Sequence, residues 1–302
     1  MERLNEAMAM ERVAILGTGL IGASAGMALR ARGFAGAVGG WDPKPGEAEV
    51  ALRLGAIAEI ATDPVTLAKR SDVIVLAGPV SAIVDWLERL APVLGAHQLV
   101  TDVGSVKGVL CARAEGRYNG PEQPGYLPGH PMAGKEVGGA TNATAELFAG
   151  AAWLFAEPEG VAERSAPAAA LAEEWRAWVA KLGCRVLDTD PVRHDVLCAW
   201  ISHLPQMVST ALSALLEEQF EADADLLPIG GRALKEMTRL GSSPFSMWRD
   251  IALTNTEAIA NSLLALEQRL AHIRENLRTP ELREEFARAN EFRLGSGATE
   301  KQ

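Results

Sequence analysis

A glycine pattern near the start of the sequence has the spacing needed to bind phosphate. Gly17-x-Gly19-x-x-Gly22 lies directly between an apolar run at residues 13–16 and a helix-like segment at residues 23–32. In such a turn the first glycine permits the tight bend, the second lets the backbone approach a pyrophosphate, and the third allows close helix–strand packing. The free N–H groups and the dipole at the helix start favour an anion. The segment therefore predicts a dinucleotide-binding turn.

An acidic residue follows at the place where such a site reads the ribose. Asp42 ends the next apolar run, about twenty residues after Gly22. A carboxylate there accepts hydrogen bonds from the adenosine ribose hydroxyls and repels a 2′-phosphate. We therefore predict NAD as the cofactor and expect NADP to bind less well, although Lys44 is a nearby cation that softens this preference. The predicted cofactor-binding residues are Gly17, Thr18, Gly19, Leu20, Ile21, Gly22, Asp42, Gly78, Pro79 and Asp102.

Three polar side chains follow later apolar runs. Ser105 and Lys107 come after the run at 99–103, and His130 lies in a Pro/Gly-rich loop after the run at 125–127. Ligands bind beyond the carboxyl ends of parallel strands, so these side chains should reach one cleft. His130 is the predicted general acid/base, because imidazole exchanges protons near neutral pH. Ser105 would orient His130, bind substrate or cap a helix, and Lys107 would bind an anion or lie in solvent.

The elements that must position these residues divide the chain in two. Short apolar runs alternate with helix-like segments up to about residue 187, which predicts an α/β, doubly wound, mainly parallel sheet of the Rossmann type. Beyond it the pattern is all-helical, with Pro205 expected to kink or divide a helix. We predict domains at 1–189 and 190–302. The predicted helices are 191–220, 232–240 and 249–293. A loop at 226–232 lies between the first two, and a disordered tail is expected from Gly295.

Composition narrows the class of protein. Hydrophobic residues make up 48% of the chain and the formal net charge is −10, which is typical of a globular protein and argues against nucleic acid as a partner. No apolar stretch is long enough to span a membrane, and the N-terminus lacks the apolar core of a signal peptide. We therefore expect a cytoplasmic protein. His194 and Cys198 have i,i+4 spacing, but no further ligand lies nearby in sequence, so we predict no metal.

Four ordered segments behind the glycine turn resemble the prephenate/arogenate (cyclohexadienyl) dehydrogenase family of tyrosine biosynthesis. The resemblance covers residues 12–275. It implies an oxidoreductase that removes a hydride and CO2 from a cyclohexadienyl acid, turning prephenate into 4-hydroxyphenylpyruvate, and a homodimer formed through the helical domain. The segments are TDVGSVK (101–107), GHPMAGKE (129–136), RHDVLCAWISHLP (193–205) and LKEMTRLGSSPFSMWRDI (234–251).

The resemblance also implies residue roles. His130 would take the proton of the ring hydroxyl, and Ser105 would hold that hydroxyl or His130 itself. Arg239 matches the family arginine that grips a substrate carboxylate, for which guanidinium is suited. Gln206 departs from the family pattern S-H-L-P-H and is predicted to contact substrate. His203 is either a second substrate contact or a packed structural residue. Because glutamine both donates and accepts, arogenate and dual specificity remain open beside prephenate.

Two other readings compete with this one. A β-hydroxyacid dehydrogenase or imine reductase would place a lysine on the helical domain or lack the His130 loop. A non-catalytic NAD sensor would have lost its proton-handling and carboxylate-binding residues, and it would bind NAD without reducing it. Because Ser105, His130 and Arg239 are all present, we expect the cyclohexadienyl dehydrogenase, in a two-domain form without a mutase or regulatory domain.

Overall fold

The computed structural model of the chain describes residues 10–160, 163–221 and 225–299. Contacts divide the chain into two units, one ending at Thr256 and the other beginning at Glu257. The N-terminal residues 1–9, for which we predict no signal peptide, lie outside the described part. No helix in that described part is both long and apolar enough to cross a membrane.

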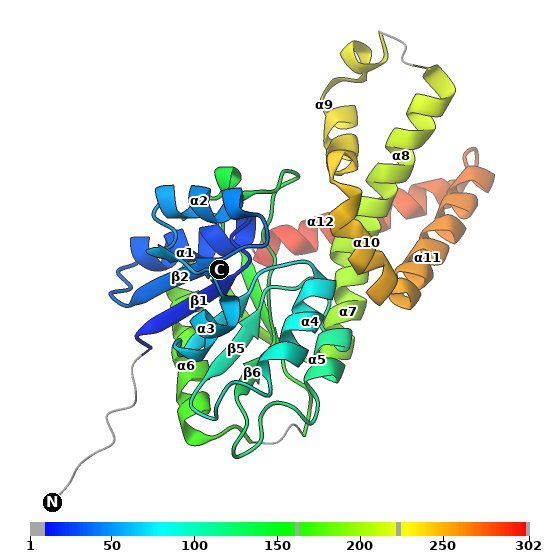
Figure 1. Cartoon of the computed structure of the whole chain (residues 1–302). Coiled ribbons are helices and arrows are strands. Elements are labelled where there is room, and N and C mark those ends of the chain that lie inside the picture. The colour runs from blue at the N-terminus through cyan, green and yellow to red at the C-terminus, as the bar shows by residue number, and fades with distance from the viewer. Residues whose placement is uncertain (1–9, 161–162, 222–224, 300–302) are drawn as a thin grey trace, which may run out of the picture. The chain divides into compact units, whose positions relative to one another are not determined.

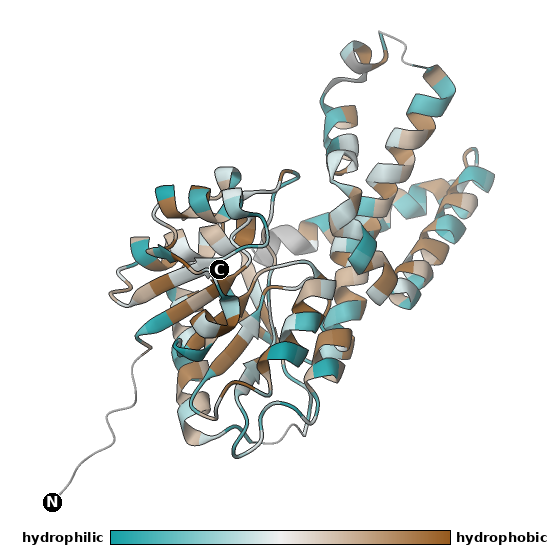
Figure 2. Ribbon diagram, viewed as in Figure 1, coloured by the Kyte–Doolittle hydropathy of each residue, from teal (hydrophilic) through white to brown (hydrophobic). Residues whose placement is uncertain are grey.

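The first unit contains a six-stranded parallel sheet in the order β3-β2-β1-β4-β5-β6 (Figure 1). The order reverses between β1 and β4, which is the switch point where doubly wound sheets bind ligands. Figure 2 shows hydrophobic residues gathered in these strands, as expected for strands covered on both faces. The predicted Rossmann-type sheet is confirmed. Its strands are Arg12–Leu16 (β1), Ala37–Trp41 (β2), Glu59–Ile60 (β3), Val73–Leu76 (β4), Leu99–Asp102 (β5) and Gly125–Leu127 (β6).

Helices connect these strands, and their first residues follow from local chemistry. Asp63 accepts a hydrogen bond from Thr66 N–H (2.8 Å) and so caps α3, and Ser165 caps α6 in the same way. Proline lies in the first turn of α2, α3 and α6, where its missing N–H costs nothing. The helices are Leu20–Ala31 (α1), Pro45–Arg53 (α2), Pro64–Lys69 (α3), Val80–Leu90 (α4), Gly108–Ala114 (α5) and Ala166–Lys181 (α6).

A second, three-stranded sheet carries part of the cleft. Its order is β7-β8-β9, with Gly129–Pro131 (β7) antiparallel to Ala152–Ala156 (β8), and Arg185–Thr189 (β9) parallel to β8. The prediction that His130 lies in a loop is therefore wrong in part, because His130 lies on β7 opposite Leu154. A Gly-His-Pro segment has no strand propensity of its own, and it becomes extended here because β8 supplies a pairing edge.

The helical region of the first unit begins with Pro191–Cys198 (α7) and a π-helical turn at Ala199–His203 (η2). Pro205 follows in the first turn of Leu204–Phe220 (α8), so the predicted break occurs where the proline removes a helical hydrogen bond. Next come Leu226–Thr238 (α9), the 3-10 turn Arg239–Ser242 (η3) and Phe245–Thr254 (α10).

Three helix boundaries differ from the sequence prediction. The predicted loop at 226–232 is part of α9, which bends at Gly231, whose φ of 59° only glycine adopts easily. The predicted helix at 249–293 is divided into α10, Thr256–Glu275 (α11) and Pro280–Thr299 (α12). The predicted disordered tail from Gly295 is helical up to Thr299, because the strong helix formers before it propagate the helix. The second unit consists of α11 and α12 from Glu257 onward, with Arg269 of α11 paired to Glu285 of α12 (2.8 Å).

Two carboxylates fasten the helical region of the first unit to loops that follow β4 and β5. Asp195 of α7 accepts hydrogen bonds from the N–H groups of Lys107 (2.7 Å) and Gly108 (2.8 Å) at the start of α5. Asp250 of α10 accepts from the N–H of Ser81 (3.1 Å) in the first turn of α4. These bonds satisfy N–H groups that a helix start leaves free. They hold α7 and α10 against the carboxyl ends of the central strands.

Candidate active site

The glycine turn has the geometry that the sequence predicts. Gly17 has a φ of 106°, and a Cβ there would lie 2.5 Å from the Ala77 carbonyl oxygen. A Cβ on Gly22 would lie 1.9 Å from the Gly17 carbonyl oxygen, so only glycine fits either position. Gly19 has no heavy atom within 4 Å of such a Cβ, and it therefore faces open space beside the turn. This combination fits the close approach of a pyrophosphate.

The start of α1 offers backbone donors to the same space. Gly19 occupies the N-cap position and makes no side-chain cap, so the first N–H groups of the helix remain for a ligand. Thr18 and Leu20 are buried, and Thr18 Oγ1 has no hydrogen-bond partner. Thr18, Leu20 and Ile21 can therefore serve a dinucleotide through their backbone.

Asp42 lies directly after β2 and next to the glycine turn. One carboxylate oxygen accepts from the N–H of Thr18 (2.8 Å) and the other from the N–H of Lys44 (2.9 Å). The side chain is half-buried, and each oxygen keeps a lone pair for a further donor. The carboxylate is thus fixed at the edge of the glycine turn, where a ribose hydroxyl would donate to it.

Asp102 and Lys107 have roles other than those expected. Both side chains are fully buried and form an ion pair with each other. The second Asp102 oxygen accepts from Tyr126 OH (2.7 Å), so the carboxylate is satisfied inside the protein. A buried pair of this kind is stable only when its other lone pairs and protons are hydrogen-bonded. The Asp102 carboxylate therefore has its partners inside the protein, and its predicted contact with the cofactor stays a prediction. Lys107 is neither solvated nor free for an anion. Gly78 and Pro79 lie between β4 and α4, with the Gly78 nitrogen close to Gly17, and their contact with the cofactor stays a prediction.

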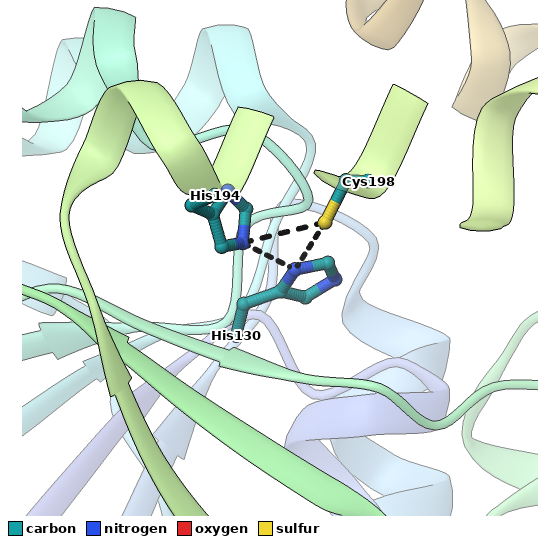
Figure 3. Close-up of side chains that lie close together, drawn as sticks. All are labelled: His130, His194 and Cys198. Atoms are coloured by element: carbon teal, nitrogen blue, oxygen red, sulfur yellow. Dashed lines mark hydrogen bonds between the residues drawn. The ribbon is translucent and has the colours of Figure 1, made fainter. Parts of the chain in front are cut away.

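His130 belongs to a hydrogen-bonded chain of three side chains that the sequence analysis does not identify. Its Nδ1 lies 2.9 Å from Nε2 of His194, and Nδ1 of His194 lies 2.8 Å from Asp195 Oδ1. Figure 3 shows the two imidazoles meeting, with His130 on β7 and His194 on α7. His194 is fully buried, and His130 is 7% exposed. Burial, together with the neighbouring imidazole, lowers the pKa of His130 well below its ordinary value, so the ring is neutral.

This chain fixes which nitrogen of His130 holds its lone pair. The Asp195 carboxylate only accepts hydrogen bonds, so Nδ1 of His194 carries a proton. Burial also lowers the pKa of His194, and the neutral ring then accepts at Nε2. Nδ1 of His130 must therefore donate, which leaves the lone pair on its Nε2. Nε2 lies on the far side of the ring (Figure 3) and has no hydrogen-bond partner among the described residues. It is suited to accept a proton from a ligand.

Ser105 is half-buried and makes no side-chain hydrogen bond within the described part of the chain, so it does not orient His130. That task falls to His194 and Asp195, which the sequence analysis misses as site residues. The adjacent residues His194 and Asp195, near the start of the segment 193–205 that resembles the family, could have indicated a proton-handling pair. The sequence does not predict that this pair contacts β7.

Arg239 lies on η3 with 61% of its side chain exposed, and it forms an ion pair with Glu136 from the segment after β7. Two chain regions far apart in sequence are thus joined by the predicted carboxylate-binding residue. An exposed guanidinium exchanges partners easily, because a surface ion pair is worth only about 0–1 kcal/mol. Arg239 therefore remains available to a substrate carboxylate.

His203 and Gln206 are both buried in the helical region. His203 packs edge-on against Trp248 (ring centroids 5.8 Å apart), its Nε2 has no partner, and burial lowers its pKa to about 4. His203 is therefore a packed neutral ring whose Nε2 keeps a free lone pair or proton, and its contact with substrate stays a prediction. Gln206 Nε2 donates to Leu240 O (2.7 Å) and to Thr210 Oγ1 (3.1 Å), which fixes the orientation of the amide. Only Oε1 of Gln206 is left for another partner.

The chain is similar in sequence and in fold to known prephenate and arogenate dehydrogenases. A Bacillus subtilis prephenate dehydrogenase is 28% identical over 254 residues, which are 82% of this chain and 65% of that protein. This chain thus spans less than two thirds of that relative. The crystal structure of Aquifex aeolicus prephenate dehydrogenase in complex with hydroxyphenyl propionate and NAD+ superposes with a TM-score of 0.79 at 29% identity, covering 97% of this chain and 98% of that one. Synechocystis arogenate dehydrogenase gives 0.73 at 29% identity, covering 94% and 99%.

Two family descriptions match consecutive parts of the chain. Residues 25–180 match the nucleotide-binding domain of prephenate dehydrogenase, and residues 190–290 match its dimerization domain. The first match contains His130 and most of the parallel sheet, and the second contains His194 and Arg239. The chain therefore belongs to the prephenate dehydrogenase family.

Proposed function

We propose that this chain catalyses the NAD-dependent oxidative decarboxylation of prephenate to 4-hydroxyphenylpyruvate in tyrosine biosynthesis. The observation that carries the proposal is the chain Asp195–His194–His130, which leaves a proton-accepting nitrogen on His130. The glycine turn and Arg239 supply the two other requirements, a dinucleotide and a carboxylate contact. We also propose that residues 1–189 form the nucleotide-binding domain and residues 190–302 form the helical domain.

The reaction needs little from the protein beyond positioning and one proton transfer. When bound, the nicotinamide ring of NAD accepts the hydride from the ring carbon that bears the hydroxyl. Nε2 of His130 takes the hydroxyl proton, which raises electron density at that carbon. The ring carboxylate leaves as CO2, its bonding electrons complete the aromatic ring, and His130 returns the proton to the phenolate oxygen. Ser105 has a free hydroxyl and is the candidate for holding the substrate hydroxyl, and Arg239 holds a carboxylate.

The test is product analysis with the full chain. Incubation with NAD and prephenate should give NADH, CO2 and 4-hydroxyphenylpyruvate in equal amounts. Arogenate is a second candidate substrate, because the fixed amide of Gln206 leaves an oxygen that can accept from an ammonium group. Tyrosine formed from arogenate at a comparable rate would assign dual specificity. NAD binding without NADH formation from either acid would overturn the proposal and indicate the non-catalytic sensor.

Asp42→Ser should erode the preference for NAD over NADP. The carboxylate loses its hydrogen bonds from the ribose and its repulsion of a 2′-phosphate, which together correspond to about a tenfold or larger change in the ratio of kcat/KM values. The ratio for the two cofactors is the measurement, because Asp42 also holds the N–H of Thr18 and its loss affects both cofactors. Lys44→Gln is the matched control and should shift the ratio toward NAD. An unchanged ratio in Asp42→Ser would show that another residue discriminates.

Arg239→Gln should raise the KM for the cyclohexadienyl acid by about tenfold or more, because a charge-assisted hydrogen bond to its carboxylate is lost. We expect kcat and NAD binding to change little. Arg232→Gln, at an almost fully exposed arginine of α9, is the control and should leave KM as it is. If KM for both acids were the same in Arg239→Gln as in the unsubstituted chain, Arg239 would not bind the carboxylate.

The helical region also supports a homodimer, as the family implies. Large apolar side chains are exposed along it, and a solvated monomer would leave this surface uncovered. Figure 2 shows hydrophobic stretches along the ribbons of the helices after α7. Sedimentation of the full chain at micromolar concentration should give the mass of two chains. The exposed residues include Trp200, Ile201, Leu215, Phe220, Phe245 and Leu253.

A further inference from the structure

The site contains a cysteine side chain for which the proposed reaction has no use. Cys198 comes from α7, one turn after His194, and its Sγ lies 3.6 Å from His194 Nε2 and 3.9 Å from His130 Nδ1. The three atoms lie within 4.8 Å of one another, and all three residues are buried (Figure 3). We propose that His130, His194 and Cys198 form a binding site for Zn²⁺, and that an enzyme molecule with this site occupied is inactive.

The spacing of the three atoms matches what the ion requires. In tetrahedral zinc sites the Zn–N and Zn–S bonds are about 2.0–2.1 and 2.3 Å, which separates two nitrogens by about 3.4 Å and a nitrogen from a sulfur by about 3.6 Å. The two N–S separations are 3.6 and 3.9 Å, and the N–N separation is 2.9 Å. Opening the imidazole pair by about half an ångström therefore produces three tetrahedral ligand positions. The fourth would be water entering on the side where His130 is exposed.

The surroundings of the ligands favour an ion of this class. A zinc-bound histidine usually donates its other ring N–H to a carboxylate, and His194 already donates Nδ1–H to Asp195 (2.8 Å). Two imidazoles and a thiolate form a ligand set that suits zinc rather than magnesium or calcium. In the sequence, His194 and Cys198 have no third ligand nearby, and the fold supplies His130 from β7.

Binding can be written with a balanced proton count. Burial raises the pKa of the Cys198 thiol to about 12, so the ion must displace that proton, which is released to solvent. The proton on Nδ1 of His130 moves through water to Nε2, and Nδ1 becomes the ligand. Nε2 then carries a proton and accepts none from substrate. The inhibition therefore rests on the proposed function, whereas the binding does not.

Cobalt(II) is the probe, because it occupies zinc sites and reports thiolate ligation by its charge-transfer absorption in the near ultraviolet. Titration of the full, reduced chain with Co²⁺ should give this band and tetrahedral visible bands, saturating at one ion per chain and abolished by added Zn²⁺. Cys198→Ala should lose the charge-transfer band. Cys184→Ala, at another buried free cysteine, should keep it.

Inhibition of turnover by Zn²⁺ is a second measurement on the same variants. Zn²⁺ should inhibit turnover of the unsubstituted chain and of Cys184→Ala, and a chelator should restore it. The inhibition constant in Cys198→Ala should rise by about tenfold or more, since loss of even an outer-shell partner costs 10–100-fold in affinity. No charge-transfer band in the unsubstituted chain, or the same band in Cys198→Ala, overturns the site. If no cyclohexadienyl acid is turned over, the cobalt spectrum still decides the binding, and the two failures are distinguishable.

Discussion

His130→Asn is expected to lower kcat by about 10²–10⁴-fold while NAD binding is retained. The reason is geometric as well as chemical. An asparagine amide reaches the position of Nδ1, where it can still bond Nε2 of His194, but it places nothing at the position of Nε2. The fold of the site is therefore preserved and only the proton acceptor is lost.

The measurement is kcat under saturating prephenate and NAD, with nicotinamide binding followed separately by fluorescence. His97→Asn is the matched control and should leave kcat unchanged, because His97 is exposed and precedes β5, at the opposite end of that strand from Asp102 and Ser105. A kcat for His130→Asn within threefold of the unsubstituted chain would remove His130 from the proton transfer.

The second large effect is expected at His194, which acts through His130 and is a positioning residue. His194→Leu fills much of the buried volume but leaves Nδ1–H of His130 without an acceptor, so nothing fixes the lone pair on Nε2. Loss of the correct tautomer in Ser-His-Asp enzymes costs about 10⁴-fold in kcat, and we expect a loss on the order of 10²-fold or more here.

His194→Gln separates this role from packing. Its amide oxygen can take the place of Nε2 and accept from His130, so kcat should recover to within about tenfold of the unsubstituted chain. The ring ¹⁵N shifts of His130 provide a readout independent of turnover: the Nε2 lone pair should be seen in the unsubstituted chain and in His194→Gln. Equal kcat values in the Leu and Gln variants would mean that His194 contributes only volume.

The parts of this account that follow from sequence are those in which one short segment determines its own geometry. The glycine turn is such a case, because a Cβ at Gly17 or Gly22 would collide with backbone atoms and Gly19 leaves open space beside the turn. The alternation of apolar runs with helix-like segments likewise predicts the parallel sheet, because strands buried on both faces are continuous apolar runs. Pro205 marked the π-helical turn for a local reason, its missing N–H.

What sequence could not supply are partners brought from elsewhere in the fold. His130 meets His194 across 64 positions of sequence, and no periodicity encodes that contact. Lys107 looks like any polar loop residue until Asp102 and Tyr126 are seen to enclose the same buried space. His203 and Gln206 were assigned from a motif, but the packing of Trp248 and Leu240 decides which of their atoms remain available.

The central claim is that the chain oxidises and decarboxylates prephenate with NAD, using Nε2 of His130 as the proton acceptor. The most direct measurement is the initial rate of NADH formation from prephenate and NAD, taken side by side for the full chain and for His130→Asn. The account predicts a clear saturable rate for the unsubstituted chain and a rate at least about 10²-fold lower for the variant. No NADH from a folded chain that binds NAD, or equal rates for the two proteins, would contradict it.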